Sequence, residues 1–221
     1  MPLLLAYSNG LVVFPTVRDH GIPTAYASVQ LSPASLDSLL SRLGARETDG
    51  LADSVFDLAP TTTDQHSLFF LVAGTSGGRV FQVRAALLAG DTLDARIPTT
   101  LRRLYALVSG FRLAGASPWT PDSIKVAIWP YEYAPDNPPV EWPSRLPPLS
   151  DPRWMRRPDP VVTEMGFLRL PFSDVPLLDS IITVRREKQA IGIGGHKWAL
   201  SYRWVFPHED EWAQIADRLD S

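Results

Sequence analysis

The sequence contains no cysteine at any of its 221 positions. This absence excludes disulfide bonds, thiolate metal sites, iron–sulfur clusters and cysteine nucleophiles. Long apolar runs are also missing: none approaches the roughly 18 residues of a membrane-spanning helix, so we expect no membrane span. The start of the chain lacks the basic region of a signal peptide. We expect a cytoplasmic protein, and keep export followed by removal of a leader as the alternative.

Charge of one sign does not dominate either half of the chain. The formal net charge is −3, with 11 basic and 13 acidic side chains in residues 1–150 and 10 and 11 in residues 151–221. Proteins that bind nucleic acid usually carry a basic field, so we expect no nucleic-acid partner. Three stretches nevertheless interleave basic and aromatic residues, as single-strand-binding faces do: 153–157, 185–188 and 197–204.

Histidine is scarce, and the four histidines form no metal-binding pattern. None are four residues apart, and neither H-E-x-x-H nor H-x-H occurs. The segment Gly192–Lys197 looks like a phosphate loop, but it lacks the four-residue spacer and the hydroxyl residue after the lysine. We therefore expect neither a metal ion nor a cofactor.

Proline, in contrast, is abundant: the 21 prolines are about twice the usual share. Ten of them lie in Trp129–Pro160, together with three tryptophans and two tyrosines. Because a large aromatic side chain costs roughly 2 kcal/mol or more to leave in water, we expect an ordered strap packed across both halves of the chain. The predicted regions are 1–129, the strap 130–160, and 161–221, with fusion into one domain as the alternative.

Apolar patterns and turn signals predict a repeated order of elements. The clearest helix start has Ser32 as N-cap and Pro33 in the first turn, and Gly44 is placed to end that helix. A second helix is expected with Thr99 or Thr100 as its N-cap, and residues 181–186 suit either helix or strand. Strands are expected at 3–7, 11–17, 25–31, 67–73, 79–87, 123–129, 189–193 and 197–205, and further helices at 174–182 and 207–219.

The order strand, strand, helix recurs three times, over 11–43, 67–113 and 189–219. Hairpins followed by helices build antiparallel sheets, so the sequence predicts an α+β fold of repeated hairpin-plus-helix units with the helices on one face. A doubly wound parallel sheet is the less favoured alternative, because the strand–helix–strand rhythm is missing.

One serine motif carries a catalytic hypothesis. The segment Gly74-Thr75-Ser76-Gly77-Gly78 matches the G-x-S-x-G nucleophile elbow and follows an apolar run. Over these five residues the chain resembles an α/β-hydrolase, which implies a small serine hydrolase with Ser76 as its nucleophile. The available partners are His196 or His208 as base and Asp151 or Asp136 as orienting acid. Since residues 79–87 suit a strand better than the required helix, we favour a glycine hairpin turn.

The composition favours binding over catalysis. Seven tryptophans, six tyrosines and several arginine–aromatic neighbours are typical of interfaces, although tryptophan also fills cores. We predict a non-enzymatic protein-binding module, such as a toxin-neutralising (immunity), inhibitory or accessory subunit, whose partner is another protein. The candidate binding surface is the rim of the strap, with Tyr131, Tyr133, Trp142 and Trp154.

Overall fold

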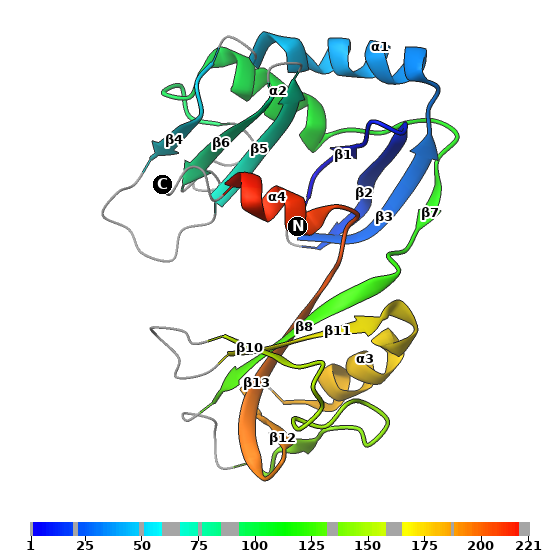
Figure 1. Ribbon diagram of the computed structural model, residues 1–221, viewed down its shortest axis with the longest axis vertical. Coiled ribbons are helices and arrows are strands. Elements are labelled where there is room, and N and C mark those ends of the chain that lie inside the picture. Colours follow the sequence, from blue (N-terminus) through cyan, green and yellow to red (C-terminus); the bar gives the residue numbers. More distant parts are fainter. Residues whose placement is uncertain are drawn as a thin grey trace. The chain divides into compact units, whose positions relative to one another are not determined.

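The computed structural model describes residues 2–19, 22–48, 51–58, 67–74, 77–84, 93–131, 137–157, 165–186 and 188–216. The chain forms two compact units (Figure 1). Unit 1 comprises Met1–Trp119 and His208–Ser221, and unit 2 comprises Thr120–Pro207. This division differs from the expected boundaries at 129 and 160, because the strand that begins at Ser123 is the centre of the unit 2 sheet and cannot be separated from the strap.

Unit 1 contains two sheets whose neighbouring strands are antiparallel except for the pair β4 and β6. One sheet has the order β1-β2-β3-β7, with strands Leu5–Ala6, Leu11–Asp19, Ile22–Gln30 and Ser117–Trp119. The other has the order β4-β6-β5, with strands Ser54–Asp57, Gly77–Arg84 and Ser67–Gly74. The hairpins β2–β3 and β5–β6 were predicted. Strand β4 is not among the strands that the sequence predicted.

Two helices of unit 1 share a core with both sheets. Helix α1, Pro33–Leu43, begins as predicted: the Ser32 hydroxyl accepts a hydrogen bond from the Ser35 amide at 3.2 Å, and Gly44 ends the helix at φ +71°. Helix α2, Thr99–Ser109, follows Pro98 without a side-chain cap, so the prediction of a threonine cap is wrong. The core contains Leu36, Leu39, Leu43, Leu101, Leu104, Tyr105 and Val108 from the helices and Val12, Phe14, Phe70, Phe81 and Val83 from the sheets.

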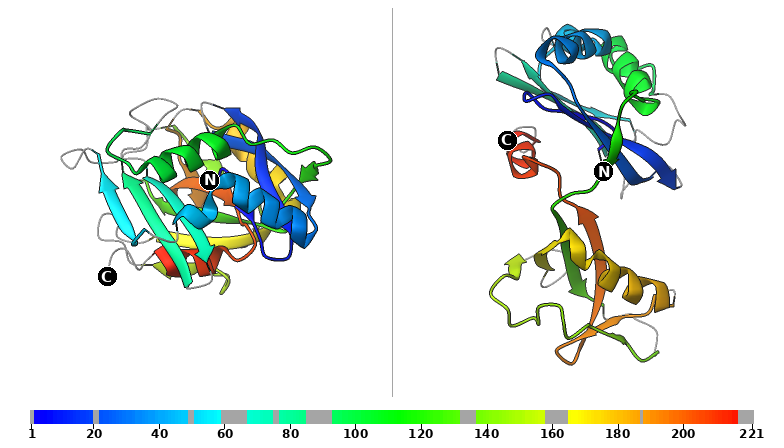
Figure 2. Two further views of the ribbon diagram at one scale, coloured as in Figure 1. Left: turned by 90° about the horizontal axis from the view of Figure 1, so that it is seen from above. Right: turned by 90° about the vertical axis from the view of Figure 1, so that its right-hand side faces the viewer.

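The last helix of unit 1, α4, Glu209–Ala216, lies on the opposite side of the sheets from α1 and α2 (Figure 2). The expectation that all helices lie on one face is therefore wrong for this unit. The half-buried Trp212 holds α4 in place, since its ring stacks on Tyr7 with centroids 6.1 Å apart. Burial, together with the nearby Glu209 carboxylate, raises the pKa of Tyr7 well above its usual value.

Unit 2 is built on one six-stranded sheet with the order β10-β11-β8-β13-β12-β9. Its strands are Met155–Arg157, Met165–Pro171, Ser123–Pro130, His196–Trp204, Ile191–Ile193 and Val140–Glu141. Only β12 and β9 pair in parallel. The predicted hairpin β12–β13 turns through Gly194 and Gly195, whose φ angles of +60° and +80° are those that a tight two-residue hairpin turn requires.

Helix α3, Val175–Val184, follows a short 3-10 helix, Phe172–Asp174, and packs on one side of the unit 2 sheet (Figure 1). Residues 181–184 are therefore helical, and the strand alternative is wrong for them. Tyr202 of β13 donates its hydroxyl proton to Asp179 of α3, which ties the helix to the sheet. The predicted α+β class is confirmed, and strand, strand, helix occurs as β2-β3-α1, β5-β6-α2 and β12-β13-α4.

The described part of the strap belongs to unit 2 and contributes to its core. Leu146 and Trp154 are buried there with the inward residues of β8. Gly166 leaves the space for this packing, because a Cβ atom at that position would lie 3.0 Å from Ile128 Cγ1 and 3.3 Å from Trp154 Cε3. Within the described part of the chain, no helix has both the length and the apolar character needed to cross a membrane.

Candidate functional site

The serine motif does not lie in the structural context that a nucleophile elbow needs. Strands β5 and β6 are antiparallel, with Gly74 opposite Gly77, so that a strand follows the motif in place of a helix. Ser76 itself lies outside the described residues.

The proposed partners of Ser76 have other surroundings. The Asp151 carboxylate accepts hydrogen bonds from Nε and Nη2 of Arg153, at 3.0 and 2.9 Å, and from the Arg153 amide at 2.9 Å. These bonds lower the pKa of Asp151 and stabilise a turn of the strap. His196 is exposed at the start of β13, and His208 Nδ1 lies 2.9 Å from Glu211 Oε1. Asp136 lies outside the described residues. Across the described ranges, the structure brings together no group of three potential metal ligands.

The structure describes three of the four residues predicted for the rim of the strap. Trp154 is only 7% exposed and packs in the core, so its expected place on a rim is wrong. Trp142 is half-buried against it, with ring centroids 6.2 Å apart, and donates from Nε1 to the Pro147 carbonyl at 3.1 Å. Tyr133 lies outside the described residues. Tyr131 is half-buried, and its amide donates to the Lys197 carbonyl at 3.1 Å.

A different surface of unit 2 is a better candidate. The inward positions of β8, at Ile124, Val126 and Ile128, face α3 and the core, so the alternate positions of β8 and of its neighbours face the other way. We call this second side of the sheet the outer face. Its members are Lys125, Ala127, Trp129 and Tyr131; Met155, Phe167 and Arg169; and Lys197, Ala199, Ser201 and Arg203.

Cations on three adjacent strands form one row across the outer face. Lys125 of β8 lies opposite Arg169 of β11 on one side and Arg203 of β13 on the other. The Lys125 ammonium lies 4.9 Å from the centroid of the Phe167 ring. Arg169 and Arg203, both exposed, make further interactions of their own.

Apolar and small side chains lie beside the cation row. Met155 is 59% exposed and lies opposite the half-buried Phe167. The next positions carry small side chains, with Ala127 opposite Ser201 and Ala199 opposite Trp129. Lys197, beyond them, is exposed next to Tyr131. The face therefore carries small side chains between cations at its two ends.

Acidic side chains are nearly missing from this side of the sheet. Among the described outward positions of the six strands, the one acid is Glu141 of the edge strand β9, opposite Gly192. The sequence predicted strand β8, which supplies Lys125 and Trp129. Strand β11, which supplies Phe167 and Arg169, was not predicted, so the sequence did not reveal the face as a whole.

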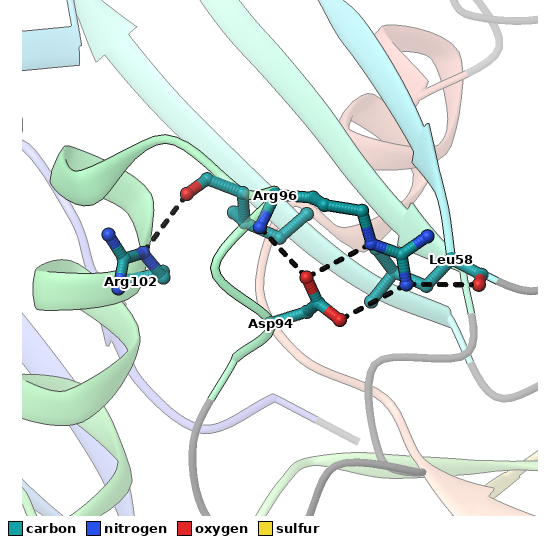
Figure 3. A network of polar contacts seen from close by, with 5 residues as sticks. Leu58, Asp94, Arg96 and Arg102 are labelled. Carbon is teal, nitrogen blue, oxygen red and sulfur yellow. Dashed lines mark hydrogen bonds and ion pairs between the residues drawn. The ribbon is translucent and has the colours of Figure 1, made fainter.

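Unit 1 offers a second candidate, a hollow of about 300 Å³ lined by Leu93, Thr99, Arg102, Arg103, Tyr105 and Ala106. The loop before it is held by Arg96, which binds the Asp94 carboxylate and the Leu58 carbonyl (Figure 3). Arg102 donates to the Ile97 carbonyl at 3.0 Å, and Arg103 pairs with Glu47 at 3.3 Å. The outer face of unit 2 is the stronger candidate, because it combines a row of cations with the exposed apolar side chain of Met155.

The outer face, with its cation row and exposed Met155, is the candidate site of this structure. No protein-family model, no curated protein and no solved structure matches the chain.

Proposed function

We propose that this protein is a non-enzymatic module that binds another protein through the outer face of unit 2. The main support for this proposal is that the two sides of the six-stranded sheet differ. Helix α3 and the strap pack on one side, while the other side presents exposed cations and an exposed Met155 to solvent. A subunit that neutralises, inhibits or assists its partner acts in this way, by covering a surface of that partner.

The chemistry of the face is that of a protein interface. Arginine, methionine and aromatic residues are enriched at such interfaces, and the outer face combines all three. An exposed methionine adapts its shape to different partners, because its side chain is unbranched and flexible. The side chains of Ala127 and Ser201 are small, so a partner backbone can approach closely there.

Single-strand nucleic-acid binding is less favoured by the same residues. That mode of binding requires aromatic faces open to stacking bases. Phe167, Trp129 and Tyr131 are all half-buried, and the Lys125 ammonium already lies over the Phe167 ring. A protein surface needs no free ring face and accommodates this arrangement.

Photo-crosslinking in cells of the native host tests the proposal. A photoreactive amino acid replaces Met155, which is 59% exposed on the outer face, and in a matched variant it replaces Val184, which is 66% exposed at the end of α3. Both positions are apolar and open, so they differ mainly in the side of the sheet they sample. We expect one discrete protein adduct from position 155 and none from position 184.

The opposite result contradicts the proposal. If both positions yield the same adducts, or if position 155 yields none while the variant is folded and expressed, the outer face is not a protein-docking surface. A folded variant is recognised by an unchanged circular dichroism spectrum and melting temperature.

A further inference from the structure

The charge of the outer face specifies the chemistry of the partner, an inference that rests on the proposed function. We infer that the partner docks an acidic segment on this face, with carboxylates along the row of Lys125, Arg169 and Arg203. Lys197 supplies a further cation at the other end of the outer face, next to Tyr131. Carboxylates are the complementary groups for arginine and lysine in protein interfaces.

The spacing of the row fits a cluster of carboxylates. Neighbouring strands lie about 4.8 Å apart, so the three cations extend over roughly 10 Å. Acidic side chains three or four positions apart on a helix are separated by about 5–6 Å, which matches this spacing. A partner segment with two or three such acids can therefore contact several members of the row at once.

The Lys125 side chain connects the charged part of the outer face with its apolar part. Its ammonium lies over the Phe167 ring, which is opposite the exposed Met155, and also belongs to the cation row. An acidic segment with apolar or aromatic residues between its carboxylates matches both. An acidic segment without them would meet only the cations.

A defined probe tests the inference on the whole chain. The probe is a fluorescein-labelled ten-residue peptide in which glutamate alternates with tyrosine, and its control has glutamine in place of glutamate. Fluorescence anisotropy measures binding at about 20 mM and about 200 mM salt, where screening differs strongly. We expect saturable binding of the acidic peptide that weakens with salt, and little binding of the glutamine peptide.

Substitutions test whether the acidic peptide binds to the outer face. Lys125→Glu reverses the central charge and should weaken binding about tenfold or more. Lys125→Met keeps a long unbranched side chain at this position but removes the charge, so it remains informative if Lys125→Glu does not fold. The matched control is Arg186→Glu, which makes the same charge change at an exposed position after α3 and should alter affinity less than about twofold.

Several results would overturn the inference. These are equal binding of the acidic and glutamine peptides, equal losses in Lys125→Met and Arg186→Glu, and tighter binding of a labelled ten-nucleotide oligothymidine than of the acidic peptide. If position 155 gives a discrete adduct but the two peptides bind equally, or Lys125→Met and Arg186→Glu lose equal affinity, the protein-binding function stands. Only the inference of an acidic partner is then refuted. Tight oligothymidine binding without such an adduct would remove both.

Discussion

Replacing Trp154 by alanine tests whether the strap is part of the core of unit 2. The side chain is 7% exposed, packs beside the Trp142 ring and lies over Gly166. A tryptophan side chain buries about 150–250 Å², which at about 25 cal/mol per Å² corresponds to an upper value of roughly 4–6 kcal/mol. Measured costs of removing large aromatic side chains from cores are about 3–5 kcal/mol, so we expect a loss in this range.

Part of that loss should be offset at the indole nitrogen. Trp154 Nε1 is the one buried side-chain polar atom without a hydrogen-bond partner among the described residues. An unsatisfied buried donor costs about 1–3 kcal/mol, and the alanine variant removes this cost together with the ring. We therefore expect the loss to lie nearer the lower end, at about 3 kcal/mol.

Hydrogen exchange measured by mass spectrometry detects this loss of stability in the strands around Trp154. The amides of β8 and β11, which lie next to Trp154, should exchange faster in Trp154→Ala, whereas those of α1 in unit 1 should not change. The control is Trp142→Phe, which removes the hydrogen bond to Pro147 but keeps a half-buried ring and should cost about 1 kcal/mol. Unchanged protection of β8 in Trp154→Ala, or rapid proteolysis within 137–157 of the parent protein, would refute the structural role of the strap.

Two further predictions concern ionisation. Hydrogen bonds from the side chain and the backbone of Arg96 lower the pKa of Asp94 to about 2, below its unfolded value, so their stabilising effect is present above about pH 4 and is lost as the pH falls towards 2. A carboxyl-carbon NMR titration of Asp94 should show a midpoint near 2, and a midpoint near 4 would contradict the network of Figure 3. Burial and then the Asp179 carboxylate raise the pKa of Tyr202 to about 12, so this contribution is present below about pH 10 and is lost as the pH rises through 12. The difference in ultraviolet absorbance between the parent and Tyr202→Phe should titrate near pH 12; a midpoint near 10 would show that Tyr202 does not bind α3.

Local signals in the sequence predicted local structure well. Ser32, Pro33 and Gly44 define the ends of α1 because capping depends on neighbouring residues. The glycine-rich turns predicted both β5–β6 and β12–β13, since hairpin pairing is set by the turn itself. Strand β4 was missed because its four residues acquire their structure from a parallel pairing with β6, more than twenty positions away.

The arrangement of the outer face depends on strand pairing, which a single sequence does not reveal. Alternation in β8 indicates which side Lys125 occupies, but the row forms only when β11 and β13 are placed on either side of it. Trp154 shows the converse problem. Its neighbours in sequence are charged and proline-rich, which suggested a surface residue, whereas the absence of a side chain at Gly166 makes room for it in the core.

The affinity of the protein for the partner captured at position 155 tests the central claim most directly. The measurement compares two double variants with the same change in charge: Lys125→Glu with Lys197→Glu on the outer face, and Arg185→Glu with Arg186→Glu at the end of α3. We predict that the outer-face variant binds the captured partner at least about tenfold more weakly than the parent protein, while the α3 variant stays within about twofold. Equal affinities of the two variants would contradict the claim that the outer face of unit 2 is the docking surface.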